Sequence, residues 1–272
     1  ALACSLLPLV FAAACHAGDV DSCSTTPLRM ATAASLREVG QALVDDLARA
    51  EIPLRIEASF GASSALAYQI ELGAPIDILI SADARIVEAL TRADQVVDRA
   101  TREIARGRLV LAAASGSEFD ALGLDALGSA RLKRIGLPHR AVPLGRYGSA
   151  WLDSFVPGDS LEGKIVRTED ARSNLAALEL GHVDLAILYE TDFRLGRNLT
   201  PLHRPAAEHY PEIRYLATRT RRAPQCPGVE RVLDAWLAPA TQRRLRAAGF
   251  DPPRATRADP DAAKSEPAGA TS

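Results

Sequence analysis

Small hydroxyl residues stand where predicted strands give way to predicted helices. The clearest case is residues 59–66 (SFGASSAL), which an alternating strand enters and a helical pattern leaves. A helix start presents unpaired backbone N–H groups and the positive end of the helix dipole, so it binds an anion without a cationic side chain. The same arrangement recurs at Ser35, near Leu144 and near Ala171. Helix starts that converge on one point predict a receptor for a small oxyanion.

Five residues stand at such positions. Ser35 and Ser63 offer hydroxyl groups, although serine is also a favoured helix cap. Leu144 follows Pro143 in a turn into a helix, and Ala171 follows acidic residues at another helix start. Tyr189 ends an apolar strand, where a buried core tyrosine is the usual explanation. Each signal is weak by itself.

The elements that position these residues alternate between strands and helices. Apolar residues follow the helical period after the first strand, and a one-residue alternation marks the second strand. Strands are predicted at 28–33, 54–60, 76–81, 109–114, 134–137, 165–167, 185–189 and 213–218, and helices at 36–47, 64–72, 145–155, 169–180, 229–237 and 241–248, with a short helix around Val87 and Leu90. This alternation predicts an α/β fold of mostly parallel sheets, which bind ligands off the carboxyl ends of their strands.

The composition limits the size of the fold and its partners. The chain has 272 residues, of which 47% are hydrophobic, and this is enough for a large core and one or two domains. Its formal net charge is -2 and no block rich in Lys and Arg stands out, so nucleic acid is not an expected partner. Aromatic residues make up only 5%, which argues against a stacking surface for bases or sugars.

The first 27 residues are predicted to be a leader and a linker. Residues 1–14 form an uncharged apolar run, which is too short to span a membrane and is typical of a secretory signal. The AAAC sequence that ends at Cys15 resembles a lipoprotein cleavage box, so Cys15 is a candidate for lipid attachment; cleavage after Ala17 is the alternative. In an exported protein, Cys23 and Cys226 either form a disulfide or remain unrelated thiols. No spacing of Cys and His fits a zinc site.

The order of these features, and the sequence around them, resemble a known family. The matching blocks begin with residues 33–36 (AASL), 59–70 (SFGASSALAYQI) and 73–83 (GAPIDILISAD). They continue with residues 108–111 (RLVL), 142–147 (VPLGRY), 169–172 (EDAR), 186–189 (AILY) and 249–250 (GF). Together they span residues 28–250 and resemble the periplasmic molybdate-binding proteins, which are the substrate receptors of molybdate ABC importers.

The resemblance implies a periplasmic-binding-protein fold in which two lobes, joined by a hinge, enclose an oxyanion. Lobe I would comprise residues 28–107 and 195–252, lobe II residues 108–194, and residues 253–272 a disordered tail. The ligand donors carried over from the family are the hydroxyls and amides of Ser35 and Ser63, the N–H groups of Leu144 and Ala171, and the phenol of Tyr189. Family members often have Ala in place of Leu144 and Val in place of Ala171, but both contacts use the main chain.

The resemblance also implies a function. The expected ligand is molybdate, and tungstate as well because its charge and size are nearly the same. No cofactor, no metal ion bound directly by protein side chains and no catalytic turnover are expected. The implied partner is the permease of an ABC transporter in the inner membrane. The expected location is the periplasm, with a membrane anchor if Cys15 is lipidated, and the expected state is a monomer.

Two other interpretations remain open. The same fold would serve a receptor for another oxyanion, such as sulfate or phosphate. A serine hydrolase with Ser63 as nucleophile is the alternative from another class, because residues 61–65 (GASSA) nearly match the G-x-S-x-G nucleophile motif. Its triad would need a later acid together with His182, His203 or His209, none of which lies in a recognisable motif.

Three arginines also lie near the candidate helix starts. Arg37, Arg146 and Arg172 are expected to be solvated surface charges that do not contact the ligand. Arg172 falls within a block that matches the family, so it is also a candidate brace for its loop.

Overall fold

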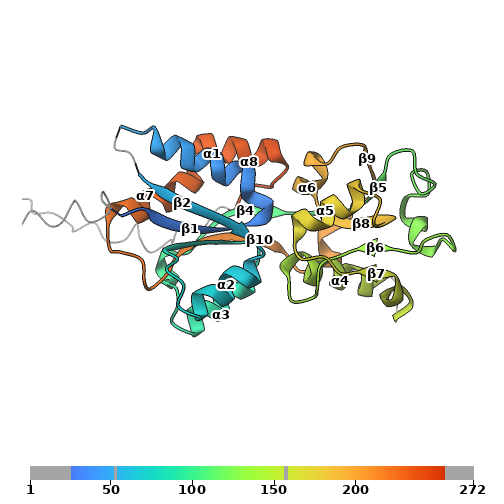
Figure 1. The fold of residues 1–272 in the computed structure, drawn as a ribbon, viewed down its shortest axis with the longest axis horizontal. Coiled ribbons are helices and arrows are strands. Elements are labelled where there is room, and N and C mark those ends of the chain that lie inside the picture. The colour runs from blue at the N-terminus through green and yellow to red at the C-terminus, as the bar shows by residue number, and fades with distance from the viewer. Residues whose placement is uncertain (1–25, 52–53, 156–158, 255–272) are drawn as a thin grey trace, which may run out of the picture.

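Two five-stranded sheets form the two halves of the protein. A computed structural model describes residues 26–51, 54–155 and 159–254. The strand order is β2-β1-β3-β10-β4 in one sheet and β7-β6-β8-β5-β9 in the other. Figure 1 shows the two halves next to each other, joined by the chain between β4 and β5 and between β9 and β10. We call the first sheet with its helices lobe I and the second sheet with its helices lobe II.

Lobe I contains the N-terminal and C-terminal parts of the described chain. Its strands are β1 (Leu28–Ala33), β2 (Ile56–Gly61), β3 (Ile78–Ser81), β4 (Arg102–Gly107) and β10 (Ile213–Arg219). Its helices are α1 (Arg37–Ala48), α2 (Ser63–Glu71), α3 (Ala84–Arg92), α7 (Pro227–Leu237) and α8 (Pro239–Ala248), with 3-10 turns η1 (Ala34–Leu36) and η2 (Asp98–Ala100). Helices α1 and α8 lie on one side of the sheet, and α2 and α3 lie on the other (Figure 1).

Lobe II is built from the middle of the chain. Its strands are β5 (Leu109–Ala114), β6 (Ile135–Gly136), β7 (Ile165–Val166), β8 (Leu185–Tyr189) and β9 (Leu199–His203). Its helices are α4 (Pro143–Phe155), α5 (Ala171–Glu179) and α6 (Glu190–Leu195), with 3-10 turns η3 (Gly123–Gly128), η4 (Asp159–Lys164) and η5 (Ala207–His209). Figure 1 shows α4 and α5 on opposite sides of this sheet.

The burial of each element follows from its sequence pattern. Every residue of β3 and β8 is buried, as expected of continuous apolar strands covered by helices on both faces. Strand β2 lies at a sheet edge, and its residues alternate between half-buried and exposed along most of its length. Helix α1 buries Val39, Leu43 and Val44, which recur at the helical period and face the main core.

The predicted α/β fold with two lobes and mostly parallel sheets is confirmed, and each sheet also contains one strand that runs against the other four. Strand β10 runs antiparallel to β3 and β4, and β5 runs antiparallel to β8 and β9. These are strands next to the two chain crossings. A chain that leaves one sheet through β4 and returns to it through β10 must run through that sheet in the opposite direction.

The second crossing lies farther along the chain than the predicted boundary at residues 194 and 195. Strand β9 pairs with β5 in lobe II, where Thr200 lies opposite Ala113 and Pro201 lies opposite Ala112. The chain re-enters the sheet of lobe I only at β10. We therefore propose that lobe II extends through residue 203.

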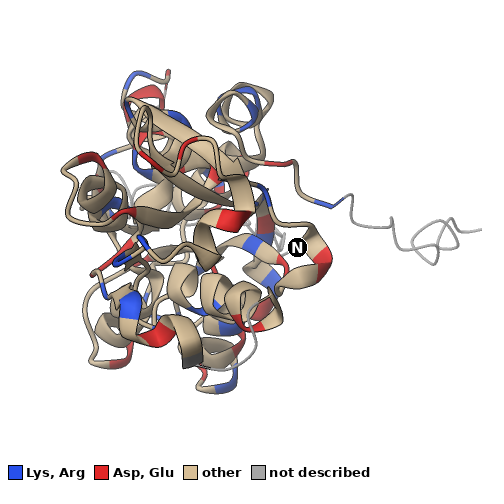
Figure 2. Ribbon diagram, turned by 90° about the vertical axis from the view of Figure 1, so that its right-hand side faces the viewer, with Lys and Arg blue, Asp and Glu red and all other residues tan. Residues whose placement is uncertain are grey.

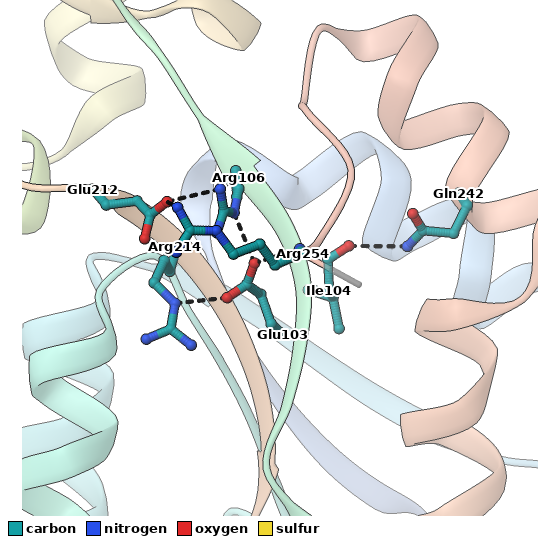
Figure 3. Close-up of polar contacts among 7 residues, drawn as sticks. All are labelled: Glu103, Ile104, Arg106, Glu212, Arg214, Gln242 and Arg254. Carbon is teal, nitrogen blue, oxygen red and sulfur yellow. Dashed lines mark hydrogen bonds and ion pairs between the residues drawn. The ribbon is translucent and has the colours of Figure 1, made fainter. Parts of the chain in front are cut away.

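A charged cluster holds β4 and β10 together beside the crossings (Figure 3). Glu103 on β4 accepts hydrogen bonds from Arg106 at 2.8 Å and from Arg214 on β10 at 2.6 Å. It also accepts one from the backbone N–H of Arg254 at 2.9 Å, and Arg106 pairs with Glu212 at 2.7 Å. Burial raises the pKa of Glu103, but the hydrogen bonds from Arg254, Arg106 and Arg214 outweigh burial and leave this pKa below its usual range.

Several predictions concern residues outside the described ranges. The residues in question belong to the leader, which includes the lipidation candidate Cys15, and to the C-terminal tail from residue 255 onward. Cys226 is disulfide-bonded. Its pairing with Cys23 stays a prediction, because Cys23 lies outside the described residues. Among the helices of the described ranges, none has both the length and the apolar character needed to cross a membrane.

Charged residues of both signs are interspersed along the ribbon in Figure 2. This distribution fits the small net charge of the chain. Within residues 26–51, 54–155 and 159–254, no group of three or more His, Cys, Asp or Glu side chains is placed to hold a metal ion.

Candidate anion-binding site

A small cavity lies between the two lobes. Its volume is about 20 Å³, which leaves room for one compact group and none for a sugar or a nucleotide. All five predicted site residues line it, namely Ser35, Ser63, Leu144, Ala171 and Tyr189. The other lining residues are Ala33, Ala34, Gly61, Ala62, Ala82, Val142, Pro143 and Asp170. The tertiary structure therefore brings together groups that are up to 154 positions apart in the sequence.

Each of the five residues lies at the carboxyl end of a strand or after it. Ser35 follows β1 and Ser63 follows β2, while Leu144 and Ala171 lie at the starts of the helices after β6 and β7. Tyr189 is the last residue of β8. Because β1 is parallel to β2, and β6 is parallel to both β7 and β8, these strand ends gather at one edge of each sheet. The cavity lies where the two edges meet.

Three α-helices begin at the cavity. The first N–H groups of each helix come before the first backbone hydrogen bond within that helix. The first i to i−4 bonds are donated by Leu66 to the Ala62 carbonyl in α2, by Arg146 to the Val142 carbonyl in α4, and by Asn174 to the Asp170 carbonyl in α5. The N–H groups of Ser63, Leu144 and Ala171 precede these bonds and have no carbonyl of their own helix to pair with. They are available to an acceptor in the cavity, and the helix dipoles favour a negative charge there.

The two serine hydroxyls are buried and held by neighbours. The oxygen of Ser63 accepts a hydrogen bond from the backbone N–H of Ala82 at 3.0 Å, which leaves its own proton free to be donated. The oxygen of Ser35 lies 3.1 Å from the phenol oxygen of Tyr215 on β10. When Tyr215 donates in this pair, the Ser35 proton is likewise free for an acceptor in the cavity.

Tyr189 contributes a third hydroxyl group to the site. Its side chain is buried, and its hydroxyl has no hydrogen-bond partner among the described residues. Burial, together with the neighbouring Tyr215, Tyr147, Asp192 and Asp83, raises the pKa of Tyr189 well above its usual value, so the phenol stays neutral and can donate. A buried unpaired hydroxyl is costly, and a ligand that accepts its proton would remove that cost.

The start of α4 is fixed by a close backbone approach. A Cβ atom at Gly145 would lie 2.2 Å from the carbonyl oxygen of His139 and 2.3 Å from that of Pro138. No side chain fits in this space, so glycine allows the preceding turn to pack against the first turn of the helix. This packing determines where the N–H of Leu144 points.

Sequence reasoning missed two tyrosines that support the site. Tyr215 holds Ser35, as described above, and Tyr147 donates to the carbonyl oxygen of Ala82 at 3.3 Å across the lobes. Burial raises the pKa of both phenols, so they stay neutral. Tyr147 lay within a block that matches the family, but Tyr215 is on a late strand with no local signal.

The expectation of a solvated arginine is correct for Arg37 and wrong for Arg146, whereas Arg172 has the several partners that its alternative role as a brace requires. Arg37 is exposed and stacks on Phe60, with its guanidinium carbon 4.7 Å from the ring centroid. The side chains of Arg146 and Arg172 are only 20% and 21% exposed, and both form ion pairs. The partners Asp83 and Glu38 lie on the other lobe, which a sequence pattern cannot reveal.

A comparison of the sequence with protein families gives one match over most of the chain. The profile of the bacterial extracellular solute-binding proteins matches residues 28–251. The chain belongs to this family. As a solute-binding protein it is not an enzyme, and the alternative of a serine hydrolase is not supported. No histidine is among the residues that line the cavity beside Ser63.

Individual relatives of this solute-binding protein agree with the family assignment. It is 29% identical over 188 residues to the molybdate-binding protein ModA of Haemophilus influenzae, covering 66% of this chain and 73% of the relative. Its fold is similar to that of the periplasmic molybdate-binding protein of Azotobacter vinelandii, with a TM-score of 0.74 and 22% identity, covering 84% of this chain and all of the other. It is also similar to the sulfate-binding protein SubI of Mycobacterium tuberculosis, with a TM-score of 0.69 and 16% identity, covering 88% and 89% of the two chains. These structures confirm the two-lobed fold.

The solute-binding protein carries a buried carboxyl group on α6. Asp192 on α6 is fully buried, and the Nε atom of Arg172 lies 3.1 Å from its Oδ1 atom. Neither carboxylate oxygen has an aligned hydrogen-bond partner among the described residues. Burial raises the pKa of Asp192 to about 7; Arg172 opposes this rise, while Glu38 and Asp170 add to it. The folded protein therefore keeps this proton to a higher pH than the unfolded chain does.

We expect Asp192→Asn to flatten the pH dependence of stability. The unfolded chain loses the Asp192 proton near pH 4 and the folded chain near pH 7, so in the unsubstituted protein Asp192 makes stability fall as pH rises through this window. The fall amounts to at most about 4 kcal/mol, because one pKa unit corresponds to about 1.4 kcal/mol. Thermal unfolding of ligand-free protein should show that the variant gains stability, relative to the unsubstituted chain, from pH 5 to pH 8.

The matched control for this experiment is Asp46→Asn. Hydrogen bonding to Arg244 lowers the pKa of the Asp46 carboxyl, so this group is ionised in both states above pH 5. Its replacement should shift stability by the same amount at pH 5 and pH 8. A constant difference for Asp192→Asn over this range would show that Asp192 is not protonated in the folded protein.

Proposed function

We propose that this solute-binding protein binds molybdate between its lobes and delivers it to the permease of an ABC importer. The observation that carries the proposal is the set of hydrogen-bond donors that meet at one cavity, including the buried and unpartnered hydroxyl of Tyr189. The names of the relatives from Haemophilus influenzae and Azotobacter vinelandii support molybdate as the ligand. Tungstate is proposed as a second ligand because it has the same charge and nearly the same size.

A site made of donors suits a fully ionised oxyanion. Every oxygen of molybdate accepts hydrogen bonds, and the candidate groups are backbone N–H groups and hydroxyls that can donate. Hydrogen bonds to a charged group contribute roughly 1.5–3 kcal/mol each. Several of them can offset the loss of water around a dianion and still give a dissociation constant in the micromolar range or tighter, about −8 kcal/mol or beyond.

We expect the protein to select molybdate and tungstate over sulfate and phosphate. Sulfate is smaller, so it would leave some donors stretched, and phosphate at neutral pH carries a proton that would face donors. Calorimetric titration at fixed ionic strength should give similar affinities for molybdate and tungstate and roughly 100-fold weaker binding of sulfate, a difference of about 2.7 kcal/mol. The fold similarity to a sulfate-binding protein makes sulfate the necessary comparison.

These titrations decide which of several oxyanions this protein binds, because proteins of the same fold bind different ones. Equal affinities for sulfate and molybdate would contradict the proposed selectivity and favour a general oxyanion receptor. No heat and no gain in unfolding temperature with either molybdate or tungstate would contradict the proposed function itself.

Delivery to a membrane permease and a periplasmic location complete the proposal. Both follow from the extracellular family and from the named relatives rather than from any surface of this chain. Binding is expected to close the lobes, because each lobe contributes donors and the anion therefore interacts better with the closed state. The permease would then recognise the closed form. A membrane anchor through Cys15 is a further proposal, which mass spectrometry of the exported protein can test.

A further inference from the structure

Arg146 connects the two lobes on the Ser63 side of the cavity. Its side chain extends from α4 in lobe II to Asp83 in lobe I, with its Nε atom 3.0 Å from the Oδ2 atom of the carboxylate and a second, shorter contact through Nη2. The Asp83 side chain is only 5% exposed, so the pair is largely shielded from water. Asp83 directly follows Ala82, whose N–H holds the Ser63 hydroxyl.

Arg172 makes the corresponding connection on the Ser35 side. Its side chain extends from α5 in lobe II to the carbonyl oxygen of Ala34 in lobe I, at 3.3 Å from Nε, and its Nη2 atom pairs with the carboxylate of Glu38 on α1. Its other partner, Asp192, belongs to its own lobe. Ala34 directly precedes Ser35, so this contact also ends at a residue next to a candidate donor.

Both arginines also stand next to candidate donors in their own lobe. Arg146 is two residues after Leu144 on the first turn of α4, and Arg172 directly follows Ala171 at the start of α5. The Arg146–Asp83 pair therefore connects the first turn of α4 with the residue after Ala82, which holds Ser63. Arg172 connects the start of α5 with Ala34 and Glu38, on either side of Ser35. Closing either pair brings candidate donors of both lobes toward the same point.

We infer that Arg146–Asp83 and Arg172–Glu38 are two latches that stabilise the closed arrangement and position the donors, and that neither arginine serves to attract the anion. Each guanidinium already faces a carboxylate, so each pair is close to neutral as a unit. An ion pair between lobes exists only when the lobes are closed, which makes its free energy part of the closing equilibrium. The latches follow from the two-lobed arrangement, and only the ligand measurements rest on the proposed function.

The carboxylate partners provide the decisive test, because the two roles predict opposite signs. If the pairs are latches, then Asp83→Asn and Glu38→Gln should each weaken molybdate binding about tenfold, mainly through faster release. If the arginines instead attract the anion, then removing the carboxylate should strengthen binding. Asparagine can retain the cap that Asp83 gives the N–H of Arg85, so this variant should fold.

Arginine variants complete a double-mutant cycle at each latch. Arg146→Gln should weaken molybdate binding about as much as Asp83→Asn, and the double variant should be no weaker than either single one, because all three lack the same contact. Arg172→Gln also loses the contact with the Ala34 carbonyl, so it should weaken binding at least as much as Glu38→Gln, and the double variant should be no weaker than Arg172→Gln. Fully additive losses in both cycles would overturn the inference.

A measurement without ligand separates the latches from the proposed function. Small-angle X-ray scattering of the ligand-free protein should give a larger radius of gyration for Asp83→Asn and Glu38→Gln than for the unsubstituted chain. Asp46→Asn is the matched control, because Asp46 pairs with Arg244 between α1 and α8 within lobe I and its loss should leave this radius unchanged. An unchanged radius in both latch variants would overturn the inference. Expansion without any binding of molybdate would support the latches and contradict the proposed ligand.

Discussion

Tyr189→Phe is expected to stabilise the ligand-free protein and to weaken molybdate binding at the same time. The hydroxyl is buried at the cavity without a hydrogen-bond partner among the described residues. Removing an unsatisfied buried hydroxyl relieves a penalty on the order of 1 kcal/mol, which corresponds to about 2–4 °C in unfolding temperature for a protein of this size. The same change removes one donor from the anion and should weaken binding roughly 10–100-fold.

The opposite signs of these two effects make Tyr189→Phe a sharp test. Thermal unfolding without ligand measures the first effect, and calorimetric titration with molybdate measures the second. A core tyrosine with no role in binding would leave the affinity unchanged, and such a result would remove Tyr189 from the site. A loss of stability without ligand would instead show that the hydroxyl has a partner in the folded protein.

Tyr210→Phe is the matched control. The Tyr210 hydroxyl accepts a hydrogen bond from the backbone N–H of Leu109 at 3.3 Å, and Tyr210 is not among the residues that line the cavity. Its removal leaves that N–H unpaired, so we expect lower stability and an unchanged affinity for molybdate. The two variants make the same chemical change and should differ in both measurements, with opposite signs in stability and a loss of affinity only for Tyr189→Phe.

Gly145→Ala is expected to reduce molybdate binding by roughly 100-fold or more. The new methyl group would lie 2.2 Å from the His139 carbonyl oxygen and 2.3 Å from that of Pro138. Both are backbone atoms, so the clash cannot be relieved by rotating a side chain. The start of α4 must move away from the turn, which misdirects the N–H of Leu144 and costs about 1–3 kcal/mol of stability. A misaligned donor loses most of its charge-assisted hydrogen bond to the anion.

Gly128→Ala provides the comparison for Gly145→Ala. A Cβ atom at Gly128 in η3 would have no neighbour within 4 Å, and this residue does not line the cavity. Its variant should keep both stability and affinity close to those of the unsubstituted chain. Circular dichroism shows whether the Gly145 variant is folded, and titration with molybdate shows whether it binds. A folded Gly145→Ala protein with full affinity would show that the start of α4 does not contact the ligand.

Local sequence patterns were sufficient to predict a helix or strand where that element alone has a clear hydrophobic pattern. The apolar runs at β3 and β8 and the helical period of α1 predicted those elements near their observed bounds. They failed where the signal is short or mixed. Strand β4 has charged residues at both of its ends, α6 has six residues, and β9 contains Pro201, which argues against a strand unless that strand lies at an edge. Strand β9 does lie at the edge of its sheet.

The sequence by itself determined the α/β alternation and the five candidate site residues, because helix starts, strand ends and the family blocks are local features of the chain. Tertiary structure alone decided which groups support them. The bond from Tyr215 to Ser35 joins residues 180 positions apart, and that from Arg172 to Glu38 joins residues 134 positions apart. Such pairs depend on how strands and helices pack within a lobe and on how the two lobes meet, and burial and pKa depend on everything packed around a group. The residues next to a group along the chain therefore do not determine its long-range partners, its burial or its pKa.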